Sequence, residues 1–173
     1  MVAKEDEWKD DEVLMLERWW TKTKARRAAH EFSGNTMGRI HKWVAFPSVL
    51  VGAVLSSVTF QPDAAPAFLA PALSVFITLT ASTQAFFGFE KKAEGHRRVS
   101  KSFGSLQRSI ELEIVRQASS FEDFFERLNQ SYSQLIEEAP FLTAEGKAIL
   151  EREGRGSATP NPFDTYRPPA TVT

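Results

Sequence analysis

The sequence has no cysteine and only three histidines among its 173 residues. Without cysteine, disulfides, thiolate catalysis and cysteine-based zinc sites are all excluded. His30, His41 and His96 form no His-x-x-x-His or Glu-x-x-His pair, the spacings at which two side chains bind one metal on a helix face. We therefore predict no metal site and interpret each histidine as a polar packing or interfacial residue.

Motifs that carry catalysis or hold a cofactor are also missing. There is no Gly-x-Ser-x-Gly turn for a nucleophilic serine, and neither a Gly-x-x-x-x-Gly-Lys-Ser/Thr nor a Gly-x-Gly-x-x-Gly loop for phosphate. The acidic cluster Glu122, Asp123 and Glu126 lies at an expected helix start, where carboxylates favour the positive end of the helix dipole. The sequence therefore predicts a protein that is not an enzyme and has no cofactor.

Two long segments lack every charged residue: residues 43–60 and residues 68–89, which are 18 and 22 residues long. A helix rises about 1.5 Å per residue, so each segment can cross most or all of the ~30 Å hydrocarbon layer of a bilayer. A short connector with two prolines joins them. The sequence therefore predicts an all-α protein with a transmembrane helical hairpin flanked by cytosolic helices. The alternative is a pair of core helices in a soluble protein.

Charged residues are distributed unevenly around this hairpin. The net charge of the chain is only −1 and indicates no nucleic-acid partner. Basic residues lie on both flanks, whereas the connector carries only Asp63. By the positive-inside rule, both termini should face the cytosol, in a multi-pass integral membrane protein. The residues to which we assign this topological role, together with contacts to lipid headgroups, are Arg39, Lys42, Lys91, Lys92, Arg97 and Arg98.

The predicted organisation has four parts. They are an N-terminal cytosolic helix (1–42), the two-helix hairpin (43–89), C-terminal cytosolic helices (90–153) and an extended or disordered Pro-rich tail (154–173). Ser33-Gly34-Asn35 is expected to interrupt the first helix. Ser119 is expected to cap a later helix in a capping box with Glu122.

Apolar periodicity describes the cytosolic helices further. After the hairpin, apolar residues recur at helical spacing and resemble a short coiled-coil seam: Val99, Phe103, Leu106, Ile110 and Ile114. The next helix carries an aromatic face that we assign to binding a partner protein: Phe121, Phe124, Phe125 and Tyr132. Trp19 and Trp20 fit either a membrane surface or a core between cytosolic helices.

Small residues recur every four positions on both apolar segments. They are Ser48, Gly52 and Ser56 on the first, and Ser74, Thr78 and Ser82 on the second. Small residues at this spacing allow helix backbones to approach closely in lipid. The simplest interpretation is that the two stripes face each other within the hairpin, and the alternative is that they pack between protomers. We predict a homo-oligomer or another membrane-associated assembly, with the lipid bilayer as the first partner.

Two segments that flank the hairpin also echo each other. Residues 24–30 precede it and residues 92–96 follow it, and each ends in a histidine that comes shortly after a basic residue and an alanine. If both segments extend the hairpin as helices, they are expected to pack side by side.

The whole layout resembles the SLATT family of two-transmembrane domains (the SMODS- and SLOG-associating effector group). The residues that carry the resemblance are Trp19-Trp20 and Ala28-Ala29-His30 before the hairpin, Glu90-Lys91-Lys92-Ala93-Glu94-Gly95-His96 after it, and the segment Tyr132-Ser133-Gln134-Leu135-Ile136-Glu137-Glu138-Ala139-Pro140. The last segment is similar to the ending of SLATT-like proteins of large DNA viruses. The resemblance covers residues 16–142 and rests on layout more than on invariant residues.

The resemblance implies a pore-forming effector that partner domains, including nucleotide sensors, gate in prokaryotic conflict systems. The chain shows no fused sensor or nuclease, so a trigger would come from another protein. We therefore expect a non-enzymatic integral membrane protein that self-associates as a SLATT-like pore. The alternative is a structural protein that tethers a partner or shell to a bilayer, such as a viral minor capsid protein in the inner membrane of a virion.

Overall fold

The computed structural model describes residues 8–60, 66 and 68–155, and the side chains of 58–60 are not described. Within these ranges it has no strand and contains the helices α1 (Asp10–Phe60), α2 (Leu69–Phe87), α3 (Phe89–Arg116), α4 (Phe121–Glu138) and α5 (Ala144–Gly154). The predicted all-α class is therefore confirmed. Most of the connector and the tail from residue 156 onward lie outside the described residues.

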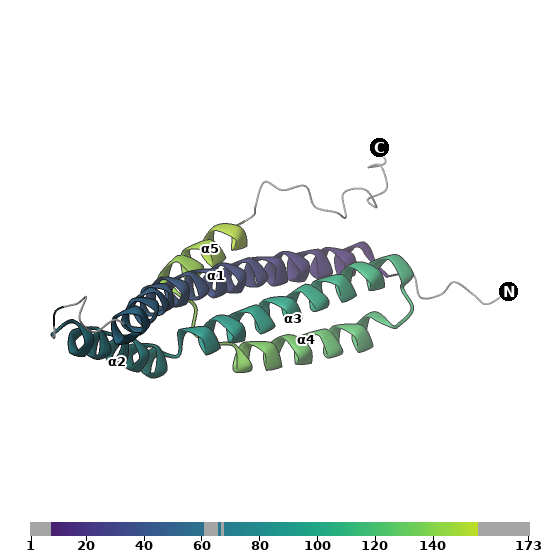
Figure 1. The fold of residues 1–173 in the computed structure, drawn as a ribbon. Helices are drawn as coiled ribbons and strands as arrows, with labels where there is room; N and C mark the ends of the chain where they lie inside the picture. Colours follow the sequence, from purple (N-terminus) through teal and green to yellow (C-terminus); the bar gives the residue numbers. More distant parts are fainter. Residues whose placement is uncertain (1–7, 61–65, 67, 156–173) are drawn as a thin grey trace.

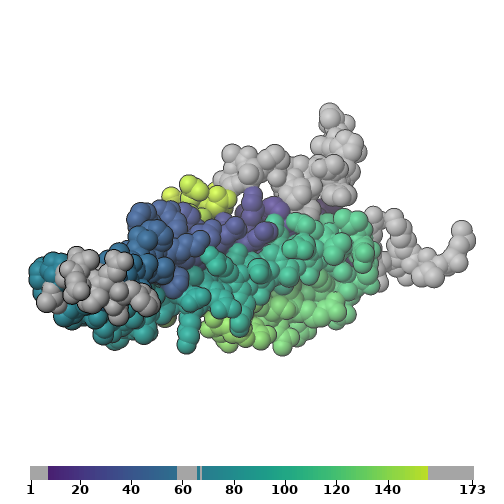
Figure 2. Space-filling view, in the orientation of Figure 1, coloured from purple at the N-terminus to yellow at the C-terminus, as the bar shows by residue number. Residues whose placement is uncertain are grey.

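The two longest helices, α1 and α3, pack side by side along the molecule, and the remaining helices attach to them (Figure 1). α4 lies against α3, α5 lies against α1, and α2 packs on the C-terminal part of α1. The molecule is elongated, with the apolar pair of α1 and α2 at one end and the helical bundle at the other (Figure 2). The chain thus forms a hairpin of apolar helices continued by a bundle.

No break occurs in α1 at Ser33-Gly34-Asn35, so the predicted interruption is wrong. A Cβ built on Gly34 would lie 3.2 Å from the carbonyl oxygen of Ala93 and 3.2 Å from Cβ of His96. The glycine therefore provides the space in which α1 and α3 approach closely, a role that local sequence does not distinguish from a break. The predicted boundary between residues 42 and 43 also lies inside this continuous helix.

A glycine does separate α2 from α3. Gly88 has a φ of 56° and a ψ of 37°, the left-handed region that residues with a Cβ adopt with difficulty. Its N–H donates to the carbonyl oxygen of Gln84 and closes the end of α2, and α3 begins at the next residue. The second apolar segment therefore passes into the helical bundle with a single-residue change of direction.

The core of the bundle is rich in aromatic residues. Phe103 and Leu16 are fully buried, and Trp20 is 7% exposed. The indole N–H of Trp20 donates to Glu111 Oε1 at 2.7 Å, so the polar end of the ring is satisfied inside the bundle. Core packing is therefore the role of Trp20. On the predicted α3 seam, four residues are buried and Leu106 is partly buried: Val99, Phe103, Ile110 and Ile114.

The ends of the shorter helices follow ordinary capping rules. Ser120, and not Ser119, is the N-cap of α4, because its hydroxyl accepts from the N–H of Asp123 at 3.3 Å. The predicted N-cap of this helix was therefore wrong by one residue. The hydroxyl of Ser119 instead accepts from Arg127. Thr143 caps the last helix, α5, by accepting from the N–H of Gly146.

Two alanine substitutions test the role of Gly34. Gly95→Ala is expected to stabilise the bundle by about 0.5–1 kcal/mol, because its Cβ would meet only Pro140 Cγ at 3.7 Å and alanine favours the helix. Gly34→Ala gains the same propensity but presses on the backbone of α3, so we expect a net loss of about 1 kcal/mol. Chemical unfolding followed by tryptophan fluorescence measures both. Equal stabilisation by the two variants would refute the close-approach role.

Candidate functional site

The apolar end of the molecule is the first candidate site. Two helical stretches of the described chain, one in α1 and one beginning with α2, are long and apolar enough to cross a membrane, and none of the residues in either apolar window is buried. Large apolar side chains are exposed there, including Trp43, Val49, Phe68, Leu79 and Phe86. A continuous apolar surface of this kind marks a contact with lipid or with protein.

Most serine and threonine hydroxyls of this end are bonded within their own helices. Serine and threonine hydroxyls donate to the carbonyl oxygen four residues earlier at 2.8 to 3.1 Å, for example Ser56 to Gly52, Thr78 to Ser74 and Thr83 to Leu79. A hydroxyl bonded in this way leaves no donor unpaired in hydrocarbon. The apolar end therefore tolerates lipid on its outer surface.

The two small-residue stripes do not face each other, so the simplest sequence interpretation is wrong. Nothing lies within 4 Å of a Cβ built on Gly52, and Ser56, Ser74, Thr78 and Ser82 are exposed. Between the helices, Ser48 donates instead to Thr80 at 2.7 Å.

The reason for this arrangement is the apolar face of α2. Leu73 and Ile77 are less exposed than their neighbours and share a face with Thr80. One residue along a helix is a rotation of about 100°, so turning Leu73 and Ile77 inward turns Ser74 and Thr78 outward. These small residues of α2 are thus left on the outside of the hairpin, where another protomer can reach them.

The six residues assigned to topology and headgroup contacts are all exposed: Arg39, Lys42, Lys91, Lys92, Arg97 and Arg98. They come from the parts of α1 and α3 that adjoin the apolar end, and these two helices run side by side (Figure 1). Basic charge therefore surrounds the hairpin on its bundle side. Which side of a membrane this is remains a prediction.

The aromatic face of α4 is not available to a partner protein. Phe124 and Tyr132 are 8% and 3% exposed, and the other two members of the predicted surface, Phe121 and Phe125, are partly buried. Trp19 packs edge-on against Phe125 and Tyr132, with ring centroids 5.6 and 4.9 Å apart. The partner-binding assignment is therefore wrong, because α1 supplies the aromatic rings that cover this face.

The two echoing segments do pack side by side, as predicted. They bring His30 and His96 together with their Nδ1 atoms 3.0 Å apart, and both side chains are buried. One ring must donate and the other accept, so the pair is held in complementary neutral tautomers. Burial lowers the pKa of His30 to about 4, assisted by the nearby charges of His96 and Arg26, and burial also lowers the pKa of His96.

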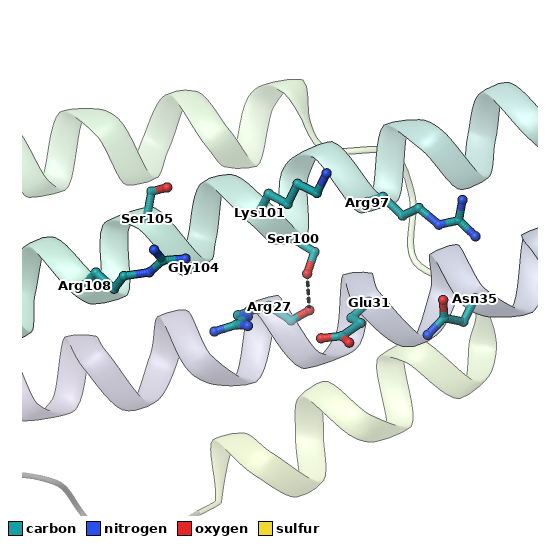
Figure 3. A pocket seen from close by; sticks show the side chains of 9 residues that line it. All are labelled: Arg27, Glu31, Asn35, Arg97, Ser100, Lys101, Gly104, Ser105 and Arg108. Atoms are coloured by element: carbon teal, nitrogen blue, oxygen red, sulfur yellow. Dashed lines mark hydrogen bonds between the residues drawn. The ribbon is translucent and has the colours of Figure 1, made fainter.

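A basic groove between α1 and α3 is a second candidate site that the sequence analysis did not single out (Figure 3). Arg97, Lys101 and Arg108 line it from α3, and Arg27 lines it from α1. Arg97, Lys101 and Arg108 follow one another at intervals of four and seven residues, which places them on one face of α3. This spacing is the signal in the sequence from which the α3 side of the groove could have been predicted. In the described ranges, no three acidic or histidine side chains lie close enough to hold a metal ion.

Comparisons of this chain with protein-family models, with curated proteins and with solved structures find no match. The function proposed below is therefore argued from the residues and their geometry.

Proposed function

We propose that the protein crosses a bilayer twice through α1 and α2, with both termini in the cytosol, and that it self-associates in the membrane. The observation that carries this proposal is the contrast in burial between the two ends of the molecule. The bundle fully buries Phe103 and Leu16, whereas neither apolar window buries any residue. Lipid covers such a surface without further protein, because every backbone hydrogen bond of a helix is internal.

Self-association is supported by the outward position of the small residues. In lipid, helices associate by close packing and not by the hydrophobic effect, and small residues permit this packing. Ser56 on α1 and Ser74 and Thr78 on α2 are exposed on the outer surface of the hairpin. A second copy of the hairpin can therefore approach both helices.

A SLATT-like pore is the activity that we propose for this assembly, without catalysis by the chain. Two helices enclose no lumen, so conduction requires several protomers arranged around a common axis. The layout shared with SLATT proteins and the outward small residues support this arrangement. A tether to a shell or partner receives less support. The aromatic face of α4, which would have bound the partner, packs in the bundle core.

Dye-loaded vesicles test the pore. The reconstituted full chain is expected to release the dye, and Ser56→Leu and Thr78→Leu are expected to weaken association about tenfold, the equivalent of losing on the order of 1 kcal/mol of packing. Release should fall in parallel. Val75→Leu is the matched control, since Val75 is also exposed on α2 and is already apolar.

Two results would contradict this proposal at different levels. Tight vesicles at a high ratio of protein to lipid would refute the pore but not the membrane location. Release of a monomeric protein by carbonate washing without detergent would refute the membrane location itself.

A further inference from the structure

The basic groove between α1 and α3 has the size and charge of a site for a small anion. Its volume is about 550 Å³, within the range of roughly 300–1,000 Å³ that is typical of small-molecule sites. Four cationic side chains and a single carboxylate line it, together with two serines, an asparagine and a glycine: Arg27, Arg97, Lys101, Arg108, Glu31, Ser100, Ser105, Asn35 and Gly104. An excess of three positive charges therefore faces one groove (Figure 3).

Among the described residues, none of these four cations has an ion-pair partner within 4 Å. Like charges brought together in this way repel one another, so their proximity disfavours folding unless an anion binds. A groove that gathers cations without partners is thus complementary to a multiply charged anion.

Two of the arginines lie across glycines of the opposite helix. Arg27 of α1 lies across Gly104 of α3, where a Cβ would be 3.4 Å from its Nε atom. Reciprocally, Arg97 of α3 lies across Gly38 of α1, where a Cβ would be 2.9 Å from its Nη2 atom. A Cβ at Gly38 would displace the end of the Arg97 side chain, whereas a Cβ at Gly104 would only touch Arg27 at van der Waals distance. Guanidinium groups match the oxygens of phosphate bidentately.

The distance of the groove from the apolar end favours an anion in solution over a lipid headgroup. Arg27 precedes Trp43 by 16 residues and Arg108 follows Phe89 by 19 residues, or about 24 and 28 Å along straight helices. The headgroup layer adds only about 5–8 Å on each side of the hydrocarbon core. A lipid phosphate would approach the Arg97 end of the groove but not the Arg27 and Arg108 end.

We propose that this groove binds a small, multiply charged phosphate compound from the cytosolic solution. Arg27, Lys101 and Arg108 contact its phosphate oxygens and Arg97 contacts its membrane-proximal end, while Glu31 limits the affinity by repulsion. Because the groove is built from both α1 and α3, the bound anion joins the two helices that continue the hairpin. The site goes beyond the proposed pore and does not depend on it.

Calorimetric titration of the full chain in uncharged detergent with inorganic tripolyphosphate tests the site. We expect saturable binding that weakens about tenfold in Lys101→Gln and in Arg108→Gln, and that tightens several-fold in Glu31→Gln. Lys147→Gln is the control, because Lys147 is an exposed cation on α5 outside the groove and should leave the affinity unchanged. Circular dichroism verifies that each variant keeps its helix content.

Two outcomes would overturn the proposal. The first is an affinity that none of the groove substitutions changes, or no binding of tripolyphosphate at millimolar concentration. The second concerns the source of the phosphate and uses nanodiscs of phosphatidylcholine with or without phosphatidic acid. If Arg108→Gln reduces association with phosphatidic acid while tripolyphosphate does not bind, the ligand is a lipid headgroup and the solution anion is refuted.

Discussion

Replacing Phe103 with alanine is expected to lower the free energy of unfolding of the helical bundle by about 3–5 kcal/mol. Phe103 is fully buried on α3 and packs against His30 and Tyr132, with ring centroids 5.9 and 5.8 Å apart. Its removal leaves a cavity where α1, α3 and α4 meet. A loss of this size is a large part of the 5–15 kcal/mol that typically stabilises a domain.

Chemical unfolding in detergent, followed by tryptophan fluorescence, measures this effect because Trp19 and Trp20 lie in the bundle. Phe141→Ala is the control, since Phe141 is 98% exposed and should contribute less than about 0.5 kcal/mol. If the two variants were equally stable, the position of Phe103 at the centre of the bundle would be wrong.

Acidification from pH 7 to pH 5 is expected to destabilise the bundle by about 2 kcal/mol through His30 alone. The unfolded histidine binds a proton near pH 6.5, whereas burial lowers the pKa of His30 in the folded protein to about 4. Between these two values the unfolded state holds the extra proton, so stability falls as the pH falls. His96 acts in the same direction, because burial lowers its pKa as well.

The variant His30→Asn isolates this effect. Asparagine places a neutral polar group near the position of Nδ1 and does not titrate, so the variant should be less stable at pH 7 but lose less stability on acidification. His41→Asn is the control, because His41 is only half-buried and is not part of the buried pair. Parallel pH profiles for the wild type and His30→Asn would show that the buried pair does not titrate as described.

The features that the sequence predicted correctly depend on interactions within one helix. Two uncharged segments of helix length predicted the apolar hairpin, and the spacing of Val99, Phe103 and Ile110 predicted the buried face of α3. The echo between residues 24–30 and 92–96 also predicted that the two segments pack side by side, since both extend the same hairpin. Periodicity and length are set by the helical repeat, which is the same in every fold.

Only the tertiary structure decided how these helices face one another. Gly34 lies where α3 approaches α1 and does not end the helix. Leu73 and Ile77 occupy the inner face of the hairpin, so Ser74 and Thr78 point outward. Which face of a helix packs inward depends on how much apolar surface each face can bury. That amount is set by the shape of the partner helix, which the local sequence does not contain.

The basic groove shows the same division. The spacing of Arg97, Lys101 and Arg108 on one face of α3 was determined by the sequence alone. The register of α1 against α3 decided that Arg27 completes the groove and that Arg27 and Arg97 lie across glycines of the opposite helix. Register is set by the side chains that pack between helices, and no local pattern records it.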